Sequence, residues 1–157
     1  MSSAHGSNLS DLELVEAYAP LVVDADTAAY FRGWLAHELR VNRCDACGHR
    51  FLPARPVCPV CWSRDVGTAV VSGRGTIFLC MLLHQGPAAP GVDYSAGPHP
   101  VVTVELDEQP GLRFTSTVVG TPAAGLAVGQ PVTLDWIERN GVPFPAFRVA
   151  EAAGVTP

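Results

Sequence analysis

Four cysteines are the residues of this chain whose type and spacing best fit a defined chemistry. They form two Cys-x-x-Cys pairs that are separated by ten residues: Cys44, Cys47, Cys58 and Cys61. Each pair directs two thiolates toward one point, so two facing pairs supply the four sulfurs of a tetrahedral metal site. The pattern predicts Zn²⁺, and iron is the alternative because the same four thiolates also accept it. A site closed by four cysteines leaves no position for water or substrate, so we expect the metal to be structural.

The residues that follow the two cysteine pairs differ. Gly48 follows the first pair, where a left-handed backbone is commonly needed and glycine adopts it without strain. Trp62 stands at the corresponding place after the second pair. We therefore expect the second turn to be shaped differently from the first. A fifth cysteine, Cys80, lies in the apolar stretch IFLCMLL and is expected to be a buried, inert thiol.

Arginines are concentrated around the cysteines. Residues 40–64 hold five arginines and one acid, which gives the segment a net charge of +4: Arg40, Arg43, Arg50, Arg55, Arg64 and Asp45. Guanidinium groups make paired hydrogen bonds with phosphate, so Arg43, Arg50 and Arg55 are candidate ligands of a phosphorylated molecule. Phe51 lies among them and either packs inside the cysteine-rich segment or stacks on a nucleotide base. A solvated loop and a protein-docking face are the alternatives for the same arginines.

One helix and a flexible extension are expected before the cysteines. Asp24 or Asp26 can cap a helix over residues 24–41, in which an apolar face repeats at helical spacing: Phe31, Trp34, Leu35 and Leu39. This face either packs on its own domain or docks on another subunit. Residues 1–23 are expected to be a flexible N-terminal extension, although the capping-box pattern SDLE at Ser10–Glu13 could start a short helix there.

The part of the chain after the cysteines is rich in strand patterns. Residues 68–84 predict two strands or one sharply bent strand, and four further strands are predicted: residues 100–107, 112–120, 131–139 and 142–150. Five strands with little helix favour a small closed barrel with the oligonucleotide/oligosaccharide-binding fold (OB-fold) over residues 67–150, and a small β-sandwich is the alternative. The complete prediction is a mainly β protein with an N-terminal helix, a rubredoxin-like zinc ribbon over residues 42–66, a five-stranded OB-fold barrel and a C-terminal tail over residues 151–157.

The charge of the barrel segment bears on whether a zinc ribbon beside an OB-fold binds nucleic acid. Residues 67–157 hold four arginines and seven acids, a net charge of −3. A groove that binds single-stranded nucleic acid needs positive charge along the phosphate backbone, so no nucleic-acid partner is expected. A single-stranded nucleic-acid-binding module is kept as the alternative function.

No arrangement of catalytic residues is evident in the sequence. It has no Ser-His-Asp pattern and no glycine-rich phosphate loop, so we expect no catalytic residue and no enzyme activity. The first residues lack a basic segment followed by an apolar run, and the longest apolar run, residues 76–83, is too short to span a bilayer. These features predict a cytoplasmic protein with no membrane partner, where reducing conditions favour metal-bound thiolates over disulfides.

Several stretches occur in an order that is typical of one known family. A helix with aromatic residues precedes Cys-x-x-Cys-Gly, and the stretches FLPARPVCPVC, GRGTIF, VVTVELDEQPGLRF, VGQPVTLDW and PFPAFR follow. Over residues 26–150 the chain resembles the acyl-CoA-associated zinc-ribbon and OB-fold family, also called domain of unknown function 35. It departs from the family pattern at Trp62, where members often carry Gly, and at Thr117, where many carry Asn.

The resemblance implies a non-catalytic accessory subunit. Members of this family accompany thiolase-like enzymes, which include thiolases, acyltransferases and the lipid-transfer-protein-like aldolases of steroid breakdown, and some accompany MaoC-type hydratases. The ribbon and barrel would hold the CoA part of an acyl thioester for such a catalytic partner. Arg43, Arg50, Phe51 and Arg55 are then the candidates for binding CoA. A purely architectural subunit without a ligand is a further alternative.

Overall fold

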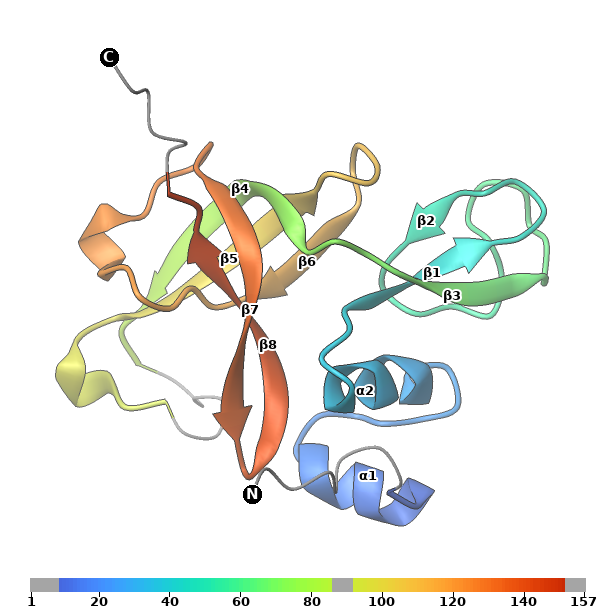
Figure 1. Cartoon of the computed structure of the whole chain (residues 1–157), viewed down its shortest axis with the longest axis horizontal. Helices are drawn as coiled ribbons and strands as arrows, with labels where there is room; N and C mark the ends of the chain where they lie inside the picture. The colour runs from blue at the N-terminus through green and yellow to red at the C-terminus, as the bar shows by residue number, and fades with distance from the viewer. Residues whose placement is uncertain (1–8, 86–91, 152–157) are drawn as a thin grey trace. The chain divides into compact units, whose positions relative to one another are not determined.

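The computed structural model describes residues 9–85 and 92–151, which form two α-helices and eight β-strands (Figure 1). The helices are α1 (Asp11–Tyr18) and α2 (Ala28–Leu35). The strands are β1 (Arg40–Cys44), β2 (Arg50–Phe51), β3 (Val66–Val70), β4 (Arg74–Leu83), β5 (His99–Leu106), β6 (Arg113–Ser116), β7 (Pro131–Arg139) and β8 (Val142–Val149). Residues 1–8, 86–91 and 152–157 lie outside the described part, and with them most of the predicted C-terminal tail and the first residues of the predicted extension.

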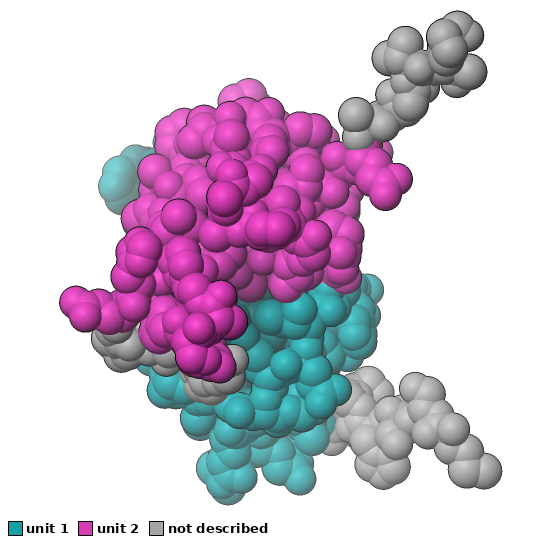
Figure 2. Space-filling view, turned by 90° about the vertical axis from the view of Figure 1, so that its left-hand side faces the viewer, with its two compact units in different colours: residues 1–72, 136–145 teal, residues 73–135, 146–157 magenta. Residues whose placement is uncertain are grey.

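The chain divides into two compact units, which Figure 2 shows in different colours. One, which we call the ribbon unit, comprises the residues up to Ser72 together with Trp136–Pro145. The other, the barrel unit, comprises Gly73–Asp135 and the residues from Ala146 onward. Strands β7 and β8 therefore contribute residues to both units. In the described residues neither helix has the length and apolar character that crossing a membrane requires.

Helix α1 gives residues 10–18 a defined structure. Ser10 and Glu13 form a capping box: the Glu13 N–H donates to Ser10 Oγ (3.4 Å), and the Ser10 N–H donates to Glu13 Oε2 (2.8 Å). Leu14 and Tyr18 are 0% and 3% exposed, so the helix buries an apolar face. The short-helix alternative is therefore confirmed for this segment, which does not form a flexible extension.

Helix α2 is shorter than the predicted helix over residues 24–41. Asp24 closes the preceding turn instead of capping the helix, because its carboxylate accepts hydrogen bonds from the N–H groups of Asp26 (3.0 Å) and Thr27 (2.9 Å). The chain leaves the helical path at His37, whose backbone is left-handed (φ 57°). The last residues of the predicted helix are strand β1, since they pair with β3 rather than with the preceding helical turn.

The apolar face of α2 is buried inside the ribbon unit. The four predicted residues are each 8% exposed or less: Phe31, Trp34, Leu35 and Leu39. The ring centroids of Phe31 and Trp34 are 4.7 Å apart, and each ring meets another of the same unit. Tyr18 lies 4.9 Å from Phe31, and Phe144 lies 5.2 Å from Trp34. Packing on its own domain is therefore confirmed, and this buried face is not available to another subunit.

A three-stranded antiparallel sheet forms the ribbon, which we define as residues 40–70, in the strand order β2-β1-β3. β1 pairs with β3 along its whole length, from Arg40 opposite Val70 to Cys44 opposite Val66. The ribbon therefore continues to Val70, whereas the sequence places its end at residue 66. Residues 67–70 belong to the ribbon because they pair with β1. The sequence pattern of a strand does not show which strand it pairs with, so the sequence could not place this boundary.

Glycine marks the break between the ribbon and the first barrel strand. The predicted strand run over residues 68–84 forms two strands, β3 and β4, which belong to different sheets. Between them, Gly73 has a left-handed backbone (φ 74°), and a Cβ atom there would lie 2.3 Å from Leu134 Cβ. Glycine alone fits both the backbone and the space, so the two-strand alternative is confirmed.

One curled sheet forms the barrel, in the strand order β6-β5-β4-β7-β8 (Figure 1). A parallel bridge between Val118, just after β6, and Phe147 of β8 joins the two ends of the sheet. Apolar side chains that are at most 2% exposed form its core: Ile77, Val102, Val104, Leu106, Leu112, Val132 and Phe147. The mainly β fold with an OB-type barrel is confirmed, and the sandwich alternative is excluded because all five strands belong to one sheet.

Candidate metal centre and arginine-rich surface

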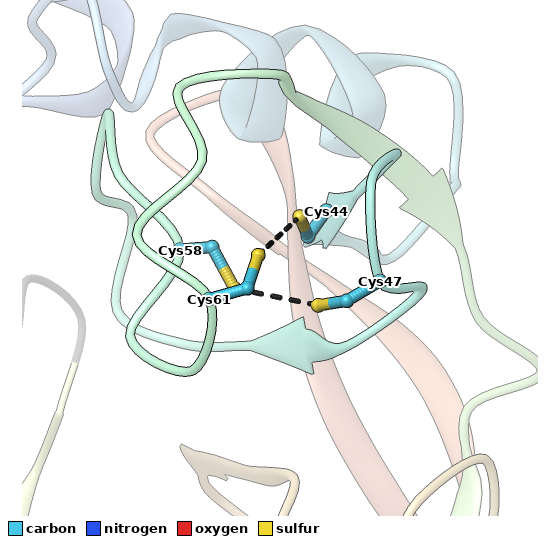
Figure 3. Close-up of side chains that lie close together, drawn as sticks. All are labelled: Cys44, Cys47, Cys58 and Cys61. Atoms are coloured by element: carbon cyan, nitrogen blue, oxygen red, sulfur yellow. Dashed lines mark hydrogen bonds between the residues drawn. The ribbon is translucent and has the colours of Figure 1, made fainter.

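The four predicted cysteines come together at one end of the ribbon (Figure 3). Cys44 ends β1, and the other three lie in the two turns of the ribbon. All four sulfurs lie within 4.8 Å of one another, with Cys44 Sγ 3.5 Å from Cys61 Sγ and Cys47 Sγ 3.7 Å from Cys58 Sγ. Disulfide sulfurs would be about 2.05 Å apart. Sulfurs at the corners of one zinc tetrahedron, with Zn–S bonds of about 2.3 Å, are about 3.8 Å apart, so the arrangement fits one metal ion.

The two cysteine turns have the same shape. In the first, the Cys44 N–H donates to His49 O (2.9 Å) and the Gly48 N–H to Cys44 O (2.8 Å). In the second, the Cys58 N–H donates to Ser63 O (2.9 Å) and the Trp62 N–H to Cys58 O (3.1 Å). The expectation that the second turn is shaped differently is therefore wrong. Both pairs present their thiolates to one point, and this common geometry outweighs the backbone preference of the residue that follows.

Trp62 adopts the backbone that glycine adopts at the matching place. Its φ is 61°, and that of Gly48 is 75°. A bulky residue in this left-handed region is uncommon. The indole is 77% exposed, and Val60 on the same turn is 60% exposed. The sequence shows that a tryptophan replaces a glycine here, but it does not show that the ring faces solvent.

Backbone N–H groups surround the sulfur of the buried Cys58. The Val60 N–H donates to Cys58 Sγ (3.4 Å). Loss of hydration raises the pKa of this thiol. The N–H groups of Cys61 and Val60 and the neighbouring thiols lower the pKa by more than that, so the result is a pKa of about 7. These donors favour a thiolate, which is the form that binds metal.

The apolar core beneath the four sulfurs is very small. Phe51 is 6% exposed and packs with Cys44 and Cys58, and the half-buried Val66 lies against them. His49 stacks on the Phe51 ring, with 6.0 Å between the centroids and 13° between the planes. The packing interpretation of Phe51 is confirmed, and its burial leaves little ring surface for a nucleotide base.

Two of the candidate arginines are direct neighbours. Arg43 of β1 and Arg50 of β2 lie opposite each other in the antiparallel pair, so their side chains share one face of the sheet. Arg55 is placed differently: its backbone carbonyl accepts a hydrogen bond from Asn42 Nδ2 (3.5 Å). Because Asn42 and Arg43 are adjacent in a strand, their side chains point to opposite faces. The structure thus places Arg43 and Arg50 opposite each other on one face of the sheet. The backbone of Arg55 is bound instead by Asn42, a side chain of the opposite face.

Several ribbon arginines lack a carboxylate partner. In residues 9–85 and 92–151, the exposed side chains of Arg43, Arg55 and Arg64 have no ion pair or hydrogen bond. Other arginines of the described part, including Arg40 at the start of the ribbon, form ion pairs with acids: Arg32 with Asp11, Arg40 with Glu38, Arg74 with Asp107, Arg113 with Glu105 and Arg148 with Asp135. Two like charges opposite each other in a sheet are unfavourable, so the pair of Arg43 and Arg50 suits an anionic ligand.

Cys80 differs from the sequence expectation. It lies in β4 and is half-buried rather than fully buried. Large apolar neighbours on the same strand are 37–47% exposed: Phe78, Leu79, Met81, Leu82 and Leu83. The apolar sequence of this strand indicated a core position, but only the first half of the strand, around Ile77, faces the barrel core.

A four-cysteine ribbon followed by one curled barrel defines the class of zinc-ribbon and OB-fold proteins. Comparison with known families agrees: residues 31–67 match the ChsH2 rubredoxin-like zinc ribbon domain, and residues 68–136 match the ChsH2 C-terminal OB-fold domain. The chain belongs to this ChsH2 family, also called DUF35, which is the family that its sequence resembles.

Similar proteins include one solved structure and two curated relatives. A chain of the Ltp2–ChsH2(DUF35) aldolase has a TM-score of 0.73 and 32% identity, over 82% of this chain and 98% of that chain. A Thermomonospora curvata protein named "Probable enoyl-CoA hydratase alpha subunit" is 33% identical over 129 residues. The 3-oxo-4,17-pregnadiene-20-carboxyl-CoA hydratase alpha subunit of Mycobacterium tuberculosis is 34% identical over 116 residues. These two matches cover 82% and 72% of this chain but 39% and 34% of the relatives, so the chain spans well under half of their length.

Proposed function

We propose that this chain is a non-catalytic, acyl-CoA-binding accessory subunit of a thiolase-like or aldolase-type enzyme, or of a MaoC-type hydratase. One observation carries the proposal: the chain is similar over almost its whole fold to a chain of the two-component Ltp2–ChsH2(DUF35) aldolase, 98% of which it covers. The curated relatives are named as subunits that act on CoA esters. A partner supplies the catalytic residues in this proposal, and the present chain supplies binding and support.

The exposed apolar side chains of β4 support the role as a subunit. Five of them follow closely along one strand, with 37–47% of each exposed: Phe78, Leu79, Met81, Leu82 and Leu83. The side chains of a strand alternate between its two faces, so both faces of this half of β4 expose apolar atoms, and exposed apolar groups that gather in one segment mark candidate interaction sites. A catalytic partner would cover such a surface in the complex.

We assign the four cysteines to one structural Zn²⁺ ion. A closed set of four thiolates gives a metal no open position for a substrate, so the ion would hold the two turns together without taking part in a reaction. The apolar core of the ribbon is too small for this task, because it consists of Phe51 with two of the cysteines and Val66. Metal-bound thiolates persist in a reducing compartment, which fits the cytoplasm.

The neighbouring side chains of Arg43 and Arg50 are the proposed site for the phosphates of CoA. Two guanidinium groups on one sheet face can hold a phosphate through paired charge-assisted hydrogen bonds. Arg55 adds positive charge from the adjoining loop. Phe51 would support this surface from below through its packing, and not by stacking on adenine.

Co-expression with a candidate partner tests the accessory role. The partner is the thiolase-like, aldolase-like or hydratase-like subunit that co-purifies with the chain from its source. We expect a stable complex in which the partner turns over an acyl-CoA substrate, and no turnover by the isolated chain. Robust turnover by the isolated chain would reject the non-catalytic role.

Calorimetry with CoA and with pantetheine tests the ligand. CoA should bind and pantetheine, which lacks the nucleotide phosphates, should not. The Arg43→Gln and Arg50→Gln changes should each raise the Kd for CoA about tenfold, the effect of losing one charge-assisted hydrogen bond. Arg148→Gln is the matched control, because it removes the same charge from an ion pair in the barrel unit.

Two other outcomes would favour the alternatives. Tight binding of a single-stranded oligonucleotide at physiological salt, without binding of CoA, would favour the nucleic-acid-binding module. Absence of both ligands from a chain that still forms the complex would favour a purely architectural subunit.

A further inference from the structure

The turn formed by the second cysteine pair exposes two apolar side chains, one of them on an unfavourable backbone. Trp62 is 77% exposed with φ 61°, and Val60 beside it is 60% exposed. The matching turn has Ala46 and Gly48 at these places, so its geometry requires neither large side chain. Backbone strain that the fold does not need is a reason to look for a function of the residue.

The second cysteine turn fixes the backbone of Trp62 before any partner binds. The Trp62 N–H donates to Cys58 O (3.1 Å), and the Cys58 N–H donates to Ser63 O (2.9 Å). In the described part of the chain no aromatic ring or guanidinium packs against the indole. A backbone that is already fixed loses little conformational entropy on binding, which favours affinity.

Positive charge lies close to these apolar side chains in the sequence. Arg64 is two residues beyond Trp62, Arg55 precedes the second cysteine pair, and both are exposed without a carboxylate partner in the described residues. Tryptophan and arginine are the residues that most often dominate binding at protein interfaces. The complementary surface is an apolar pocket with aspartate or glutamate at its rim.

We propose that the turn Val60–Trp62, together with Arg55 and Arg64, is an anchor that docks into an acidic-rimmed apolar pocket of the catalytic partner subunit. This inference rests on the proposed accessory function. A second copy of this chain that docks through the same segment fits the turn poorly, because it would bring the net charge of +4 of residues 40–64 against the same charge. A nucleotide base would stack on Trp62 alone and would leave Val60 exposed.

Trp62→Gly is the decisive variant. Glycine suits a φ of 61°, so this change removes the ring without straining the turn. Metal content should therefore stay at the level of the unchanged chain, and the melting temperature should stay the same or rise slightly. The Kd for the co-purifying catalytic subunit should rise at least about 30-fold, as for the loss of a central interface residue. Val22→Ser is the matched control, because Val22 is an apolar residue 75% exposed outside the ribbon, and its Kd should be unchanged.

The arginines provide a second readout. Arg55→Gln and Arg64→Gln should slow association with the catalytic subunit and reduce its dependence on salt concentration, as charges at the rim of an interface do. A salt dependence equal to that of the unchanged chain would contradict the acidic rim.

Other outcomes separate failure of this inference from failure of the proposed function. If the unchanged chain binds no catalytic subunit, both are overturned. If it binds and Trp62→Gly binds within twofold of it, the anchor alone is overturned. The anchor is also overturned if Trp62→Gly weakens only the binding of CoA, or if it converts a dimer of the isolated chain to a monomer in size-exclusion chromatography.

Discussion

The ribbon and the barrel are stabilised in different ways within one chain. The ribbon has a core of two cysteines, Phe51 and Val66, and four sulfurs that fit one metal ion. The barrel has a closed set of buried aliphatic side chains around Phe147 and a sheet whose ends meet. Metal ligation thus does in a short segment what apolar burial does in a longer one.

The two regions also use their arginines differently. Arg113 and Arg148 of the barrel unit pair with acids, and Arg113 lies 3.4 Å over the Phe78 ring. Arg43 and Arg64 of the ribbon have no such partner among the described residues. The comparison indicates that these barrel arginines are paired with acids, whereas Arg43 and Arg64 are available to a ligand or a partner.

Removal of the metal should give the largest difference between the two regions. Chelation or Cys44→Ser removes a ligand set whose binding of zinc contributes about 10 kcal/mol or more in small zinc domains at neutral pH. Amide exchange should show loss of protection in β1–β3 and retained protection in β4–β6, with near one equivalent of zinc in the unchanged chain. Absence of both zinc and iron from a carefully prepared sample would contradict the metal centre.

Phe147→Ala should destabilise the barrel unit and leave the ribbon unchanged. Its ring is 0% exposed, and truncating a buried phenylalanine typically costs about 3–5 kcal/mol. Urea unfolding should show this loss in the free energy of unfolding of the barrel unit, while the metal content of the ribbon stays unchanged. A loss below about 1 kcal/mol would mean that the two ends of the sheet are not joined around this ring.

The two cysteine turns can be compared by substituting the left-handed residue of each turn in separate variants. Gly48→Ala should destabilise the metal-bound ribbon by about 1 kcal/mol, because the backbone at φ 75° disfavours a Cβ atom even without a clash. Trp62→Gly should be neutral or slightly stabilising. Thermal unfolding of the zinc-bound chain measures both, and equal destabilisation by the two changes would contradict the common turn geometry.

Surface arginines should give the smallest effects. Arg148→Ala removes an ion pair with Asp135 (2.6 Å) that is partly exposed, so it should lower the free energy of unfolding by about 0.5 kcal/mol. Arg43→Ala should cause no loss, because it removes a positive charge opposite Arg50. Denaturant titrations at low and high salt check the difference, which should shrink as salt rises. A larger loss for Arg43→Ala would show that this side chain has a structural partner.

Much of this architecture was predictable because its signals are local. The spacing of Cys44 and Cys47 and of Cys58 and Cys61 predicts a four-sulfur site, and the alternating strand patterns after residue 73 predict the barrel. The capping box at Ser10 was visible, but whether α1 forms depends on the burial of Leu14 and Tyr18, and Tyr18 donates a hydrogen bond to the distant Pro143 O (3.1 Å). The same reason explains why β3 could not be assigned to the ribbon before its pairing with β1 was known.

The sequence by itself determined the spacing of the four cysteines, the order of ribbon and barrel, and the concentration of arginine around the cysteines. These properties depend on residue type and on short spacings along the chain. The tertiary structure alone decided that Phe51 is buried, that Arg43 faces Arg50, and that Trp62 projects into solvent from a glycine-like turn. Exposure and pairing depend on which distant segments come together, and a local pattern carries no record of those contacts.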